Sequence, residues 1–175
     1  LKKTGIIVIS KSGETNETLV QFLIFLSKYR KNFEKKKMQR YFTVITKKGN
    51  SSLRNLANDF LIDVIDLDNN LSGRFSAFSP VGLLPAAISG LDITKIRKGA
   101  LSLINEFLKK KHKISCEGSA IHYAAQNSKI NISVLLTYTE RLRNFGYWHE
   151  QLIAESLGKK NLGFTPIHSM GATDQ

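Results

Sequence analysis

Near its start the chain reads Gly5-Ile6-Ile7-Val8-Ile9-Ser10-Lys11-Ser12-Gly13-Glu14-Thr15. The part from Gly5 to Ser10 is short, β-branched and bounded by Gly and Ser, a pattern typical of a buried strand. From Thr15 a helix is expected, because apolar residues recur at offsets of three and four, as on one face of an amphipathic helix: Leu19, Phe22, Leu23, Leu26 and Tyr29. The stretch therefore predicts a strand, a polar turn and a helix in direct succession.

The alternation of strands and helices continues beyond this helix. We expect strands at Tyr41 to Thr46 and Phe60 to Leu67, separated by a short helix at Ser51 to Asn58. Such alternation implies an α/β fold, in which a mostly parallel sheet has helices on both faces and right-handed crossovers.

The rest of the chain is predicted to hold more helices than strands. A buried, proline-interrupted helix is expected within residues 77–90, followed by helices at 96–111 and 119–127. A strand at Ile130 to Tyr138 precedes a long helix, Glu140 to Leu157, whose apolar side chains should point inward: Leu142, Phe145, Trp148 and Leu152. We place a change of domain between about Lys111 and Asn131.

The composition is that of an ordinary globular protein. The chain has 175 residues, of which 42% are hydrophobic. The one cysteine, Cys116, cannot form an internal disulfide, and neither a signal peptide nor an apolar run long enough to cross a bilayer is present. We expect a soluble, reduced, cytoplasmic protein. Because the chain opens almost inside a strand, without Met, and ends abruptly, we also expect it to be an internal fragment of a longer protein.

The net charge of +12 raises the question of a polyanionic partner. Nine Lys or Arg face one acid, Glu34, between Lys28 and Lys48. These basic residues lack the interleaved aromatics that stack on bases, so a solvated basic surface is favoured over nucleic-acid binding. A positive field also attracts anionic metabolites such as phosphorylated substrates. A basic nucleic-acid module remains an alternative, and its affinity would fall steeply with salt.

The turn from Ser10 to Thr15 is the first candidate site. A turn that follows a strand of a parallel sheet lies at the carboxyl edge, where ligands bind in open α/β folds. Its backbone N–H groups, its hydroxyls and the positive end of the following helix suit a phosphate. An ordinary helix cap, with Ser12 as the capping residue, explains the turn equally well.

Two further candidates come later in the chain. In Gly73-Arg74-Phe75-Ser76 a guanidinium could hold an anionic oxygen, although an arginine that ties down a loop is the simpler interpretation. Gln151 and Glu155 are four residues apart and would share one face of a helix, where a glutamate is usually solvated. The four histidines show no metal-ligand spacing, so the residues indicate no metal site.

Taken together, these stretches resemble the glucose-6-phosphate isomerase family in its bacterial type. The likeness rests on four motifs in matching order: Ile9-Ser10-Lys11-Ser12-Gly13, Gly73-Arg74-Phe75-Ser76-Ala77-Phe78-Ser79, Trp148 with Glu155-Ser156-Leu157-Gly158-Lys159, and Gly171-Ala172-Thr173-Asp174-Gln175. The family builds its site from two sugar-isomerase (SIS) domains, each an αβα sandwich around a parallel sheet. By that likeness residues 1–111 are the latter part of the first SIS domain and residues 128–175 begin the second.

The resemblance implies a role for each candidate residue. Ser10, Lys11, Ser12, Gly13 and Thr15 match the loop that holds the sugar phosphate. Arg74 matches the arginine that stabilises the enediolate, Glu155 the base that moves a proton between C1 and C2, and Gln151 a substrate-contacting glutamine. The family needs no metal or redox cofactor, and it works as a homodimer on a small sugar phosphate, with no nucleic-acid or membrane partner.

The sequence departs from the family pattern at two positions and lacks some of the site. Ser72 replaces the first of two glycines before the arginine, and Glu14 occupies a position where a hydroxyl residue is common, so its carboxylate should point away from the phosphate. By the resemblance, a Gly- and Ser-rich phosphate loop would precede Leu1, a ring-opening histidine would follow Gln175, and a late lysine is also missing. We therefore expect the fragment alone to be inactive. The alternative is a non-catalytic SIS protein that binds a phosphosugar to regulate another process.

Overall fold

The computed structural model of the chain describes residues 3–110, 113–160 and 162–174. The chain divides into two compact units, the first ending at Ile93 and the second beginning at Thr94. The sequence predicts domains at residues 1–111 and 128–175. Residues 1, 111 and 175 lie outside the described residues, and these domain limits stay a prediction.

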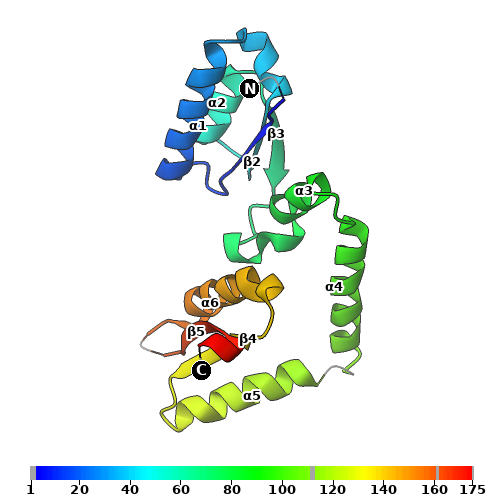
Figure 1. The fold of residues 1–175 in the computed structure, drawn as a ribbon, viewed down its shortest axis with the longest axis vertical. Helices are drawn as coiled ribbons and strands as arrows, with labels where there is room; N and C mark the ends of the chain where they lie inside the picture. Colours follow the sequence, from blue (N-terminus) through cyan, green and yellow to red (C-terminus); the bar gives the residue numbers. More distant parts are fainter. Residues whose placement is uncertain (1–2, 111–112, 161, 175) are drawn as a thin grey trace. The chain divides into compact units, whose positions relative to one another are not determined.

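The first unit is built on a three-stranded parallel sheet (Figure 1). Its strands are β1 (Ile6–Ile9), β2 (Phe42–Lys47) and β3 (Asp63–Leu67), and their order in the sheet follows their order in the chain. Val8 pairs with Val44, and Val44 with Val64. The α/β class with a parallel sheet, expected from the alternation of strands and helices, is confirmed.

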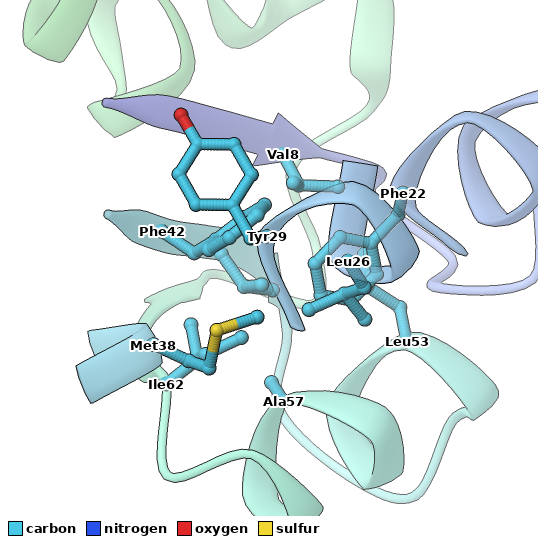
Figure 2. Close-up of a cluster of buried hydrophobic side chains, with 10 residues drawn as sticks. Val8, Phe22, Leu26, Tyr29, Met38, Phe42, Leu53, Ala57 and Ile62 are labelled. Atoms are coloured by element: carbon cyan, nitrogen blue, oxygen red, sulfur yellow. The ribbon is translucent and has the colours of Figure 1, made fainter. Parts of the chain in front are cut away.

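Helices α1 (Asn16–Arg30) and α2 (Ser52–Asp59) pack on one face of this sheet. The alternation predicts helices on both faces, but right-handed crossovers between strands that follow one another in one direction place these two helices on the same side. The core between them and the sheet is shown in Figure 2: Val8, Phe22, Leu26, Tyr29, Met38, Phe42, Val44, Leu53, Ala57 and Ile62. Met38 comes from a short 3-10 helix, η1 (Lys35–Arg40).

The expected apolar face of α1 is correct at Phe22, Leu26 and Tyr29, but not at Leu23, which is 47% exposed. The three buried residues are separated by four and three positions and so share one side of the helix. Leu23 follows Phe22 directly and is rotated about 100° from it. Its exposure therefore follows from helix geometry.

After β3 the chain forms a 3-10 helix, η2 (Gly73–Phe78), and then α3 (Pro80–Ile88). Ser79 caps α3 by accepting a hydrogen bond from the backbone N–H of Val81, 3.2 Å away. Pro80 suits the first position of the helix, because a backbone N–H at this position has no partner within a helix and proline has none to satisfy. Pro85 lies within this helix, as predicted. The expectation that α3 is buried is wrong for the structure described, in which none of its residues is buried. An apolar composition does not by itself supply a packing partner.

The second unit has a two-stranded parallel sheet of β4 (Ile132–Thr137) and β5 (Thr165–Met170). Its helices are α4 (Ile93–Leu108), which starts at the end of the first unit, α5 (Ile114–Asn127) and α6 (Arg143–Leu157). Two 3-10 turns, η3 (Glu140–Leu142) and η4 (Gly171–Thr173), complete it. Strand β5 was not predicted, because Pro166 interrupts the strand pattern and cannot donate to a ladder.

The sequence also predicts the wrong environment for one side of α6. Leu142, Phe145 and Trp148 were expected to point inward, but they are 44%, 47% and 38% exposed, and only Leu152 is partly buried. Of the 14 residues of α5, the five from Ile114 to Gly118 precede the helix start expected at Ser119. No helix in the described part of the chain is both long and apolar enough to span a membrane.

Candidate functional site

The loop from Ser10 to Thr15 brings three hydroxyl groups together at the end of β1. The Ser10 and Thr15 hydroxyl oxygens are 2.9 Å apart, and those of Ser12 and Thr15 are 3.5 Å apart. Ser10 is buried, whereas Ser12 and Thr15 are exposed. The three hydroxyls thus form a cluster in which Ser10 is buried and the other two are accessible to solvent.

The helix-cap interpretation of this loop does not hold in its expected form. Thr15, not Ser12, is the N-cap of α1, and no side-chain cap hydrogen bond is made there. The Ser12 hydroxyl accepts a hydrogen bond from the backbone N–H of Glu14 (3.1 Å), and the Ser10 hydroxyl accepts one from the N–H of Gly13 (3.1 Å). The hydroxyls therefore organise the loop itself and lie beside the positive end of α1.

Neighbouring segments hold the loop in place. The carbonyl oxygen of Lys11 accepts a hydrogen bond from the N–H of Lys47 at 3.1 Å, and that of Gly13 accepts one from the N–H of Leu53 at 3.0 Å. Gly13 has φ +72° and lies directly against Ser51. A left-handed residue in so close a contact has to be glycine. The loop is therefore attached both to β2 and to the first turn of α2.

The Glu14 carboxylate is turned toward α2. Its two oxygens accept hydrogen bonds from the backbone N–H and from the hydroxyl of Ser52, both at 2.7 Å. The backbone and side-chain hydrogen bonds of Ser52, and then the charge of Lys47, hold the pKa of Glu14 below its ordinary value. The carboxylate is engaged with Ser52, which fits the expectation that it points away from a bound phosphate.

A cavity of about 200 Å³ joins the loop to the segment that carries Arg74. Its lining includes Ser10 and Lys11 from the loop, and Gly73 and Ser76 from η2. The Ser76 hydroxyl donates to the carbonyl of Gly73 at 2.5 Å and so closes the turn around Arg74. Arg74 is half-buried, with its guanidinium carbon 5.1 Å from the centroid of the Phe75 ring. The structure thus brings two of the predicted motifs to one edge of the sheet, as expected for the carboxyl ends of parallel strands.

Gln151 and Glu155 lie on α6, in the second unit. The Gln151 amide donates a hydrogen bond to a carboxylate oxygen of Glu155 at 2.8 Å, and both residues are exposed. The spacing of four residues therefore places the two side chains in contact, as the sequence predicts. The hydrogen bond from the Gln151 amide orients the Glu155 carboxylate.

Sequence reasoning missed two residues of this region. Ser76 shapes the turn that carries Arg74, and Ser52 binds the carboxylate of Glu14. Ser76 belongs to the Gly-Arg-Phe-Ser motif and could have been found there, whereas Ser52 is 38 residues from its partner and gives no local signal. In the described ranges no three His, Cys, Asp or Glu residues are grouped as a metal site would require.

Several relatives of this chain are named glucose-6-phosphate isomerase. It is 38% identical to glucose-6-phosphate isomerase of Methanocaldococcus jannaschii over 179 residues, which is 100% of this chain and 43% of that protein. It is 35% identical to glucose-6-phosphate isomerase of Carboxydothermus hydrogenoformans, covering 99% of this chain and 39% of the relative. For the Campylobacter jejuni enzyme of the same name, the identity is 33% and the coverage 100% and 43%.

A solved structure also matches. The crystal structure of a hypothetical protein from Thermus thermophilus matches 99% of this chain and 42% of its own, with a TM-score of 0.88 and 30% identity. No family model matches the sequence. The chain spans between 39% and 43% of the length of the relatives named above. The similarity to the glucose-6-phosphate isomerase family that the motifs indicate is therefore confirmed along the whole chain.

Proposed function

We propose that the protein to which this sequence belongs interconverts glucose 6-phosphate and fructose 6-phosphate, a step of glycolysis and gluconeogenesis in the cytoplasm. One observation carries the proposal: the hydroxyl cluster of Ser10, Ser12 and Thr15 lies beside a cavity that the Arg74 segment also lines. An anion-binding loop next to a guanidinium-bearing turn is what a phosphorylated sugar requires. The similarity to isomerases supports this choice over other phosphate ligands.

The proposed reaction needs one base and one anion stabiliser. An aldose becomes a ketose through a cis-enediol when a carboxylate takes the proton from C2 and returns it to C1, while the carbonyl and hydroxyl oxygens exchange roles through a second proton transfer. Glu155 is the proposed base, and the hydrogen bond from Gln151 orients its carboxylate. Arg74 would stabilise negative charge on the enediolate oxygens, where one well-placed donor is worth about 3–4 kcal/mol.

The phosphate does not react but fixes the sugar. Held by the hydroxyls and backbone N–H groups of the Ser10 to Thr15 loop, it would orient C1 and C2 toward the base, so that binding energy is converted into orientation. We further propose that the active protein is a homodimer and that the 175-residue chain on its own does not turn over substrate. Measurable isomerisation by the purified chain would contradict the second of these proposals.

The proposal is tested by replacing the base. In the full-length polypeptide, Glu155→Gln should lower kcat for fructose 6-phosphate at least about a hundredfold, the usual range for loss of a general base. Binding of the phosphosugar should persist, because a glutamine can still accept the hydrogen bond from Gln151. Glu106→Gln, an exposed helical glutamate on α4, is the matched control.

The outcomes separate the two functional hypotheses. Loss of turnover with retained binding in Glu155→Gln supports the isomerase. A wild-type protein that binds the sugar phosphate but shows no turnover would instead identify a non-catalytic regulator, for which Arg74 and Glu155 have no chemical role. Unchanged turnover in Glu155→Gln would remove Glu155 from the mechanism.

A further inference from the structure

Glu14 is a carboxylate inside a loop that is proposed to bind an anion. It lies between Gly13, whose N–H donates to Ser10, and Thr15, whose hydroxyl belongs to the cluster. A free carboxylate at this position would repel a phosphate, since like charges a few ångströms apart disfavour each other. The loop therefore needs either to lack this charge or to direct it elsewhere.

The structure directs it to the first turn of α2. Ser52 is the first residue of that helix, so its N–H is one of the donors that a helix leaves without an internal partner. The Glu14 carboxylate accepts this N–H and the Ser52 hydroxyl, both at 2.7 Å. Negative charge is favoured at a helix N-terminus, so the carboxylate has a better partner there than in the loop. The lowered pKa of Glu14 reflects these two hydrogen bonds and keeps the group charged.

The same contact holds the loop mechanically. The N–H of Glu14 donates to the Ser12 hydroxyl at 3.1 Å, so the position of Ser12 depends on the backbone of Glu14. The Gly13 carbonyl accepts the N–H of Leu53 at 3.0 Å, one residue after Ser52. Side chain and backbone thus attach successive loop residues to successive residues of α2. Without the side-chain contact, the exposed half of the loop would keep only the backbone attachment.

We propose that Glu14 is a positioning residue for the phosphate loop: by binding Ser52 it fixes the Ser12 to Thr15 half of the loop and turns its own charge away from the hydroxyl cluster. This inference rests on the proposed function. It assigns Glu14 a role in substrate affinity without contact with the substrate. Loss of the Ser52 contact should therefore weaken phosphate binding by more than loss of the charge strengthens it.

The test uses the full-length polypeptide and two readouts of the phosphate site. These are the inhibition constant of inorganic phosphate, and KM with kcat for fructose 6-phosphate. If positioning dominates, Glu14→Ala should raise KM and the inhibition constant about five- to tenfold, the scale of the net contribution of one hydrogen bond, with kcat changed less than about twofold. Glu14→Gln, which keeps hydrogen-bonding capacity without charge, should lie between wild type and Glu14→Ala.

Two further variants sharpen the test. Glu17→Gln removes the same charge from the first turn of α1, at an exposed position, and should leave both constants unchanged. Adding Ser52→Ala to Glu14→Ala should cause no further loss, because the two residues act through one contact. Tighter phosphate binding in Glu14→Ala, or equal constants in Glu14→Ala and wild type, would overturn the inference. A wild type without phosphate inhibition and without turnover would overturn the proposed function instead.

Discussion

Replacing Gly13 with alanine should destabilise the first unit through three separate effects. With φ +72°, an L-residue at this position costs about 1–2 kcal/mol. A Cβ atom there would be 2.7 Å from the Cβ of Ser51, closer still to its hydroxyl oxygen, and 3.0 Å from the hydroxyl of Thr46. Ser51 is buried and caps α2 by accepting the N–H of Arg54 at 3.3 Å, so displacing it sacrifices a cap worth about 1 kcal/mol. Together these effects predict a loss of about 2–4 kcal/mol.

Gly90→Ala is the matched control for this prediction. Gly90 has φ +82° in the same unit, but nothing lies within 4 Å of a Cβ built on it. Its substitution therefore reports backbone strain alone, about 1–2 kcal/mol. Urea denaturation followed by far-ultraviolet circular dichroism measures both free energies of unfolding. If Gly13→Ala costs no more than Gly90→Ala, the close packing of the loop against Ser51 contributes nothing and the reasoning fails.

Two more predictions concern other parts of the chain. Gly146→Ala on α6 should destabilise the second unit by about 1–3 kcal/mol, because the added Cβ would overlap the His168 ring on β5. The measurement is thermal unfolding, and an unchanged Tm would contradict the prediction. The pKa of Glu14 is lower in the folded protein than its ordinary value of 4.5. The stability that Glu14 contributes is therefore complete above pH 4.5 and is lost as the pH falls through the lowered pKa of the folded state. Wild type should lose more stability than Glu14→Gln when urea denaturation is repeated at about pH 3, and parallel losses would show that Glu14 is not linked to folding.

The first strand, turn and helix could be predicted because their signals are local. Strand β1 and helix α1 each begin one residue after the predicted start, since β-branched runs and helical periodicity are properties of neighbouring residues. Strand β5 could not be predicted in the same way. Pro166 removes a donor and lowers the local strand preference, and it is the parallel pairing with β4 that stabilises the strand.

The candidate site shows the same division between local and distant signals. The cluster of Ser10, Ser12 and Thr15 follows from a strand-to-helix turn, and the Gln151–Glu155 contact follows from helical spacing. The contact of Glu14 with Ser52 depends instead on the crossover that places α2 beside the loop. No pattern within the loop or within α2 specifies the contact between Glu14 and Ser52. The resemblance to the isomerases indicates only that the carboxylate of Glu14 points away from a bound phosphate.

Periodicity also specifies an apolar face without specifying what covers it. On α1 the face of Phe22 and Leu26 meets Phe42 and the rest of a three-stranded sheet, so the inference from periodicity to burial is correct. On α6 equally regular spacing leaves Phe145 and Trp148 47% and 38% exposed, because the helix meets β5 with a different side, on which Gly146 and Glu150 contact His168. Whether a periodic apolar face is buried therefore depends on which segment of the chain packs against it. A helix pattern predicts burial only where the apolar face is also the side that the helix turns toward its sheet.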